Sequence, residues 1–223
     1  LGVRTRHEPM QKKCSECKLV NFADAVVCVR CGAGLEYATY GKSGKGSLMR
    51  RAAICVLVCV ILLAGFYLSL IASASSLSSE QKQNIPAAIA VLREKGFEDE
   101  VFLLDNLAVY RSTDNWLNAS VAKENAYAAT NFPFEILTIY PDFFTYPIDD
   151  TERAAILLHE SKHLSGKDEH DAYQFVWMHR KQLGWTADKY GKSPVWRNIR
   201  QQTIDNVPLL FVCDFNHSAD CSE

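Results

Sequence analysis

A run of twenty-one residues without a charged side chain constrains this sequence most. It extends from Ala52 to Ala72 and reads AAICVLVCVILLAGFYLSLIA. As a helix it covers roughly 30 Å, the thickness of the hydrocarbon layer of a bilayer. A buried helix of a soluble domain normally has a polar face, which this run lacks. Ala72-Ser73-Ala74 resembles a signal-peptide cleavage site, but fifty-one residues precede a run that is too long for one. We therefore predict a transmembrane helix over residues 48–72.

The distribution of charge predicts how that helix is oriented. The net charge of −2 is the sum of a basic segment, with ten Lys/Arg and four Asp/Glu in residues 1–51, and an acidic segment, with fourteen Lys/Arg and twenty-two Asp/Glu in residues 80–223. Basic side chains stand just before the run, and none follows it until Lys82. The positive-inside rule then predicts a single-pass protein with a cytoplasmic N-terminus and residues 73–223 outside the cytoplasm.

Four cysteines before the span have the spacing of a metal site. Cys14 and Cys17 are separated by ten residues from Cys28 and Cys31. Two such CxxC pairs supply four thiolates for a tetrahedral structural zinc. Disulfides or free thiols are the alternative, and a cytoplasmic location disfavours disulfides. The segment has few apolar residues, so zinc would supply its folding energy.

The same segment resembles the zinc-ribbon family over about twenty residues. The pattern CxxC…N…CxxCG..L is matched by Cys14, Cys17, Asn21, Cys28, Cys31, Gly32 and Leu35. We therefore predict a cytoplasmic zinc-ribbon-like module with a basic linker over residues 1–47. A protein partner in the cytoplasm or anionic lipid is expected to contact it. Nucleic acid is disfavoured, because no aromatic stacking pattern accompanies the basic charge.

The acidic segment predicts an α+β domain over residues 85–223, preceded by a flexible Ser-rich spacer at 73–84. A helix is expected from Pro86 to Lys95. Strands are expected at Val101–Leu104, Leu107–Arg111 and Phe134–Tyr140, which would form a short antiparallel or mixed sheet. Phe134–Tyr140 is either a core strand or the edge on which a peptide substrate adds as a further strand.

A helix with metal-binding residues is expected after residue 149. Asp149 and Glu152 can form a capping box, the next turns are apolar, and Gly166 is a natural stop. His159 and His163 stand one turn apart on this helix and can hold one zinc. Glu160 stands beside them, where a carboxylate can take a proton from zinc-bound water. The apolar helix disfavours the alternative of two unrelated surface histidines.

The sequence His159-Glu160-Ser-Lys-His163 is the HExxH motif, and the chain resembles the zincin metallopeptidases over His159–Arg180. The resemblance implies a small zincin-like domain with a catalytic zinc. In the Glu-type zincins a returning helix carries a glutamate ligand, which would be Glu169 here. The metzincin pattern HExxHxxGxxH nearly fits as well, with His170 one residue late, so His170 is the alternative third ligand. A second helix is expected from Asp168 to Leu183.

The sequence suggests roles for several other residues. Tyr173 or Tyr190 could stabilise an oxyanion, and Trp177, Trp185 and Trp196 are expected in the core. Cys213 and Cys221 suggest a disulfide or, with His217, metal ligands. Asn118 and Asn216 begin glycosylation sequons.

These features favour a membrane-anchored, zinc-dependent metallopeptidase that hydrolyses a peptide or protein substrate. One catalytic zinc would be held by His159, His163 and Glu169, with Glu160 as general base. The alternative is a non-enzymatic membrane-anchored zinc scaffold or sensor. A third hypothesis is a cytoplasmic protein that binds nucleic acid.

Overall fold

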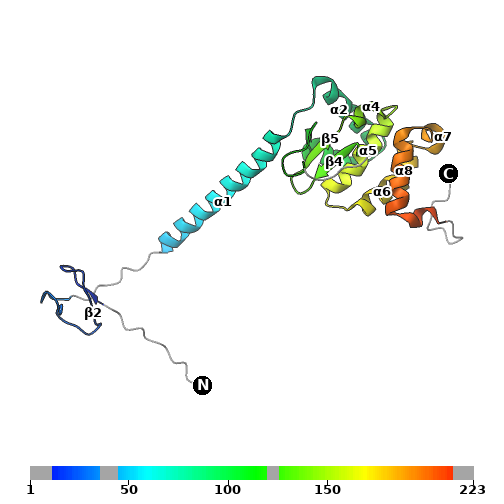
Figure 1. Cartoon of the computed structure of the whole chain (residues 1–223). Coiled ribbons are helices and arrows are strands. Elements are labelled where there is room, and N and C mark those ends of the chain that lie inside the picture. The colour runs from blue at the N-terminus through cyan, green and yellow to red at the C-terminus, as the bar shows by residue number, and fades with distance from the viewer. Residues whose placement is uncertain (1–11, 36–44, 120–125, 213–223) are drawn as a thin grey trace, which may run out of the picture. The chain divides into compact units, whose positions relative to one another are not determined.

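The computed structural model describes residues 12–35, 45–119 and 126–212. The chain divides into two compact units, Leu1–Val60 and Ile61–Glu223. Helices and two small sheets make up the described elements (Figure 1), which confirms the predicted α+β class.

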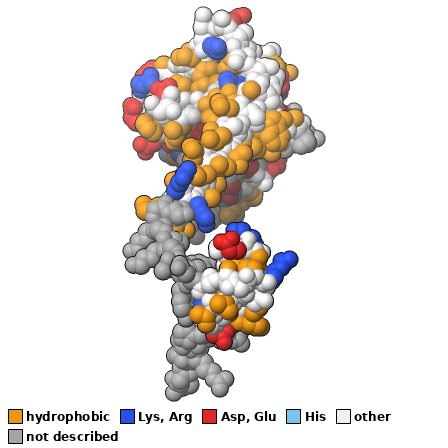
Figure 2. Space-filling model, turned by 90° about the vertical axis from the view of Figure 1, so that its left-hand side faces the viewer, with side chains coloured by type: hydrophobic (Ala, Val, Ile, Leu, Met, Phe, Trp, Pro, Cys, Tyr) orange, Lys and Arg blue, Asp and Glu red, His pale blue; other side chains and the backbone are white. Residues whose placement is uncertain are grey.

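The apolar run forms most of one long helix, α1 (Lys45–Ser73). Its stretch Leu48–Ser73 is long and apolar enough to cross a membrane, and almost none of its most apolar part is buried within the protein. Large aliphatic side chains are exposed along it from Ile54 to Leu68, and hydrophobic surface of this kind is orange in Figure 2. A helix that is apolar on all sides is stable only where protein or lipid surrounds it. The expectation of one apolar helix of membrane-spanning length is therefore confirmed.

The N-terminal module has very little core of its own. Strands β1 (Lys12–Lys13) and β2 (Val20–Asn21) pair antiparallel, and an isolated bridge joins Val27 to Gly34. Within residues 12–35 the buried hydrophobic cluster consists of Cys14, Cys28 and Leu35. Such a core is too small to stabilise a fold without a staple such as a metal.

The C-terminal unit packs its helices around a three-stranded sheet. Helix α5 is the centre of this arrangement, since it packs against α2, α3, α6 and strand β4. The elements are α2 (Ser79–Glu94), α3 (Glu98–Asn106), β3 (Val109–Arg111), β4 (Ala128–Asn131), β5 (Ile136–Ile139), α4 (Asp142–Thr145), α5 (Asp150–Leu164), α6 (Glu169–Leu183), α7 (Ala187–Tyr190), α8 (Pro194–Asn206) and a 3₁₀ turn (Pro208–Phe211).

The sheet is mixed, as the sequence predicts. The strand order is β3-β5-β4, with β3 parallel and β4 antiparallel to β5. The central position of β5 excludes the hypothesis that Phe134–Tyr140 is a free edge for a substrate, because both sides of β5 are already paired. The edge strand beside α5 is β4, which the sequence analysis did not identify.

Two other predictions fail in this unit. Val101–Leu104 lies in α3 rather than in a strand: Val101 and Leu104 are buried one turn apart while Phe102 is exposed. Three acidic residues in the first turn also favour a helix there. The predicted spacer 73–84 is ordered in the structure, since α2 begins at Ser79, with a capping box between Ser78 and Gln81.

Helix α5 begins with a variant of the predicted capping box. Asp149 is the N-cap and accepts hydrogen bonds from the backbone N–H groups of Thr151 and Glu152. The carboxylate of Glu152, however, accepts from the N–H of Ile148, one residue before the cap. Glu152 is fully buried and also accepts from Ser193 Oγ and from the indole N–H of Trp185. This single carboxylate therefore connects the start of α5 to the segments around α7 and α8.

We expect Glu152→Ala to lower the free energy of unfolding by about 2–4 kcal/mol, because two buried donors, on Trp185 and Ser193, lose their charged acceptor. Thermal unfolding followed by tryptophan fluorescence measures the change, since Trp185 lies at the affected site. Substitution of the exposed Glu94 by Ala is the control and should leave the midpoint nearly unchanged. Equal midpoints for both variants would contradict this role for Glu152.

The predicted aromatic core is confirmed. Trp177 and Trp185 are fully buried, and Trp196 is 3% exposed. Their rings contact one another at centroid distances of 4.5–6.3 Å. They pack α6 and α8 together behind the cleft described below.

Candidate functional site

Helix α5 carries both histidines on the face that turns toward α6. Its residues Ala154–Leu158 are buried and fix the helix in the core, so that His159 and His163 emerge at its C-terminal end. Gly166 ends the turn after α5 with φ +76°, a conformation that favours glycine. Asp168 then caps α6 by accepting a hydrogen bond from the N–H of Asp171. This short connection brings the first residue of α6, Glu169, back to the two imidazoles.

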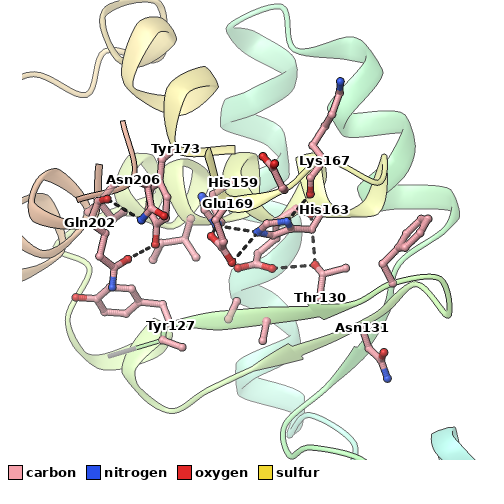
Figure 3. Close-up of a pocket in the computed structure, with 18 of the residues that line it drawn as sticks. Tyr127, Thr130, Asn131, His159, His163, Lys167, Glu169, Tyr173, Gln202 and Asn206 are labelled. Carbon is pink, nitrogen blue, oxygen red and sulfur yellow. Dashed lines mark hydrogen bonds and ion pairs between the residues drawn. The ribbon is translucent and has the colours of Figure 1, made fainter. Parts of the chain in front are cut away.

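Three side chains converge in the geometry of a zinc site (Figure 3). The Nε2 atoms of His159 and His163 are 3.1 Å apart. The Glu169 carboxylate places one oxygen 3.2 Å from Nε2 of His159 and the other 3.4 Å from Nε2 of His163. Two ligands that are each about 2.0–2.1 Å from a tetrahedral ion lie about 3.3–3.4 Å apart. The three residues therefore fit one zinc ion at distances close to those that it requires.

A hydrogen bond orients His163 for this role. Its Nδ1 lies 2.8 Å from the carbonyl oxygen of Lys167. Because a carbonyl only accepts, Nδ1 carries the hydrogen and donates it, which leaves the lone pair of Nε2 for a metal. Nδ1 of His159 is buried and makes no hydrogen bond with the described residues. The position of His159 instead depends on packing, and the centroid of its ring lies 4.4 Å from the centroid of the Tyr173 ring.

The electrostatics of the three residues favour binding of a cation. Hydrogen bonding to His159 and then to His163 lowers the pKa of Glu169 far below its usual range. Burial alone would lower the pKa of His163, but its hydrogen bond to Glu169 and the charge of Glu160 raise it to about 9. Negative charge thus gathers around Nε2 of both imidazoles. A divalent cation neutralises the same charge when it replaces the protons.

Glu160 lies beside this group without belonging to it. Its side chain is 5% exposed, and its Oε2 accepts a hydrogen bond of 2.8 Å from Thr130 Oγ1 on strand β4. Sequence reasoning missed Thr130 because thirty residues separate it from Glu160. Only the pairing of β4 with β5, and the packing of β4 on α5, bring the two together.

These residues lie in a cleft of about 760 Å³. Strand β4 and its flanking residues form one wall, and α8 contributes Ile199, Gln202 and Asn206 to another. Tyr173 lines the cleft, where its hydroxyl bonds to Gln202, and burial raises its pKa. Tyr190, the other predicted tyrosine, instead donates to Asp149 at the start of α5. The volume of the cleft lies in the range of pockets that bind ligands.

His170, the alternative third ligand, faces elsewhere. Its side chain is half exposed, and its Nδ1 lies 3.6 Å from a carboxylate oxygen of Asp171. It forms an exposed group with Asp168 and Asp171 rather than with His159 and His163. The N-cap at Asp168 explains the difference, because the first turn of α6 directs residues 169 and 170 to different faces.

The four cysteines of the N-terminal module also converge. Sγ of Cys14 lies 3.6 Å from that of Cys31, and Sγ of Cys17 lies 3.5 Å from that of Cys28. Four thiolates at about 2.3 Å from zinc lie about 3.8 Å apart, so the arrangement is that of a closed tetrahedral site. Asn21 supports it by donating to Cys28 Sγ and accepting from the N–H of Val29.

The pKa values of these thiols are consistent with a metal site. The backbone N–H of Arg30, and after it that of Cys31, lowers the pKa of Cys28 to about 6 and favours its thiolate. The backbone N–H of Ala33 acts in the same direction on Cys31, but hydrogen bonding with Cys17 and Cys14 raises its pKa to about 12. A divalent cation removes this competition for protons among crowded sulfurs.

Comparison with known proteins identifies the module. Residues 13–34 match a family described as the Zn-finger in Ran binding protein and others. The match and the geometry together make this segment a zinc ribbon that holds a structural zinc with Cys14, Cys17, Cys28 and Cys31. No curated protein and no solved structure matches the chain.

Some sequence predictions lie outside the described residues. They are the disulfide between Cys213 and Cys221, the role of His217, and the sequon at Asn216. Of the other sequon, Asn118 is described and lines the cleft, and Ser120 is not.

Proposed function

We propose that this protein is a membrane-anchored, zinc-dependent metallopeptidase of the zincin type. The observation that carries the proposal is the convergence of His159, His163 and Glu169 beside a buried glutamate in an open cleft. Three protein ligands leave a fourth position for water, as in catalytic zinc sites, whereas structural sites are closed by four. Glu160 lines the same cleft as the three converging residues and is not itself one of them.

The residues of the chain divide the chemistry of peptide hydrolysis between them. The zinc that fits this site supplies Lewis acidity, which polarises a carbonyl and lowers the pKa of water. Glu160 takes the proton of the attacking water and later gives it to the leaving nitrogen. Thr130 holds the Glu160 carboxylate in place through its hydroxyl. Tyr173 lies close enough to His159 to orient its ring and to line the substrate position.

Strand β4 is suited to hold the substrate. It pairs on one side with β5, and residues 126–132 line the cleft on the other. Backbone groups at such an edge can bind an extended peptide as an additional strand. In this proposal a peptide bound along β4 passes directly over Glu160, because Thr130 of β4 contacts that carboxylate.

The anchor and the zinc ribbon complete the proposal. In this proposal helix α1 crosses the membrane, and the basic residues before it retain the N-terminus in the cytoplasm. The zinc ribbon exposes Phe22, Val26 and Val29, each by more than three quarters. Exposed apolar side chains favour a protein partner over nucleic acid, which is bound chiefly through its phosphates.

A non-enzymatic zinc scaffold or sensor is the competing function. It would not require a carboxylate beside the metal or an open cleft of about 760 Å³. Both features favour an enzyme. The full-length protein should therefore cleave peptides when it is purified with zinc.

Metal removal tests the enzyme directly. A chelator should abolish peptide cleavage, and zinc added after removal of the chelator should restore it, because the three ligands remain in the chain. Cleavage of a mixture of unstructured peptides, followed by mass spectrometry, is the measurement. Cleavage that persists after the metal content has fallen to zero would assign the activity to another mechanism.

Thr130 offers a second test through its hydroxyl. We expect Thr130→Val to lower kcat/KM by about 10- to 100-fold, because a hydrogen bond to a charged group is worth about 1.5–3 kcal/mol. Thr130→Ser keeps the hydroxyl and should retain most of the activity. If both variants lose activity equally, the side chain acts through packing rather than through Glu160.

A further inference from the structure

The end of α1 is joined to the C-terminal unit by specific contacts. Arg111 donates from Nε to the carbonyl oxygen of Ile71. The backbone N–H of Ser112 donates to the carbonyl oxygen of Ser75. Trp116 donates its indole N–H to Ser69 Oγ and its backbone N–H to Ser73 Oγ. The domain is therefore attached along the last turns of the helix, and not only through the chain that follows it.

One aromatic residue of the apolar stretch, Phe66, contacts two aromatic rings of the C-terminal unit. The ring of Phe66 lies 5.7 Å from that of Trp116 and 5.5 Å from that of Phe134. Phe66 precedes Ile71 by five residues, which places it about 7–8 Å further along the helix. The Arg111 guanidinium is always charged, and a charge is costly in the hydrocarbon layer, so Arg111 is expected at the level of the headgroups. With Arg111 at that depth beside Ile71, the three rings lie at the upper edge of the hydrocarbon layer.

The surface around these rings is apolar and exposed. Trp116 is 52% exposed, Phe132 is 56% exposed, and Leu117 is also exposed. We call Trp116, Leu117, Phe132 and Phe134 the aromatic rim. Trp and Tyr side chains are enriched at the membrane interface, because their apolar bodies and polar edges suit the headgroup level.

The aromatic rim is continuous with the cleft. Phe132 lines the cleft, and its ring lies against Gly166, where an added Cβ would be only 3.4 Å from Phe132 Cζ. Thr130, four residues before Phe134, bonds to Glu160. Four residues span at most about 14 Å, so Glu160 lies within about 20 Å of the rings that contact α1.

We propose that the aromatic rim rests in the membrane interface and holds the mouth of the cleft at the bilayer surface. The substrate class that fits this position is the juxtamembrane segment of another membrane-anchored protein, which is cut a few residues from its own span. The substrate assignment rests on the proposed peptidase function. The contact with lipid does not, since it follows from α1 and the aromatic rim alone.

Trp116 reports on the lipid contact. The protein has four tryptophans, and the other three are buried in the core. Full-length protein in vesicles of lipids brominated at the upper acyl positions should lose the emission of Trp116, by about twofold more than with lipids brominated near the chain ends. Trp116→Phe is the control and should abolish the difference. Emission that depends on Trp116 but is unaffected by either lipid overturns the proposal.

The position of the cleft is tested with spacers. The same cleavable peptide is attached to a single-span helix through about six residues, which reach about 20 Å, or through about thirty residues of flexible spacer. At equal surface density the short-spacer substrate should be cut within about threefold of the rate of the long one, because the cleft is within its reach. A short-spacer substrate cut at least about tenfold more slowly places the cleft away from the bilayer and overturns the proposal.

Failure of the peptidase function and failure of the proposed lipid contact give different results. If neither substrate is cut, the peptidase function fails, and the quenching of Trp116 alone then decides whether the aromatic rim contacts lipid. Glu160→Gln, assayed with both spacers, verifies that any cleavage arises from this cleft.

Discussion

Glu160→Gln should lose peptide cleavage by about 10²- to 10⁴-fold in kcat/KM, the usual contribution of a positioned general base. Glutamine has nearly the same shape, and its amide oxygen still accepts the hydrogen bond from Thr130, so the local fold should persist. The amide, however, cannot take a proton from water. The loss should therefore fall on turnover rather than on the stability of the protein.

The zinc content of this variant separates catalysis from structure. Because Glu160 is not one of the converging ligand groups, the variant should bind as much zinc as the parent protein. Glu94→Gln is the matched control, since Glu94 is exposed at the end of α2 and does not line the cleft. Full activity in the Glu160 variant would contradict the role of Glu160 as general base. Loss of zinc along with activity would instead indicate a structural role.

Local patterns in the sequence predict the parts of the site that lie on one helix. The i, i+4 spacing of His159 and His163 is enough to place both imidazoles on one face, and α5 has them there. The cap at Asp168 and the left-handed Gly184 likewise give α6 nearly the predicted bounds. The choice between Glu169 and His170 depends on the path of the short segment that joins α5 to α6. The residue types in that segment do not determine its path.

Local sequence patterns do not predict contacts between segments that are far apart in the chain. Nothing near Thr130 in the sequence indicates that it bonds to Glu160, since the contact requires β4 to pair with β5 and pack on α5. The order β3-β5-β4 is also nonlocal, and it excludes Phe134–Tyr140 as a free edge. Val101–Leu104 was misread because a short apolar run fits a strand and a buried helix equally well.

A count of bound zinc should separate the two metal sites in one experiment. The proposal expects two zinc ions per chain, one in the zinc ribbon and one in the cleft. His163→Gln removes a cleft ligand and should leave one zinc and no activity. Loss of a direct ligand should weaken binding by more than the roughly 10- to 100-fold cost of changing a supporting residue. Cys28→Ser should also leave one zinc, held in the cleft.

The two single variants should differ in activity although their zinc counts agree. The ligand sets share no residue and belong to different compact units, so their losses should add, and the double variant should hold no zinc. Elemental analysis after gel filtration gives the count, and peptide cleavage gives the activity. A His163 variant that keeps two ions would place the second zinc outside the cleft. Loss of activity in the Cys28 variant would mean that the zinc ribbon takes part in catalysis or in folding of the enzyme.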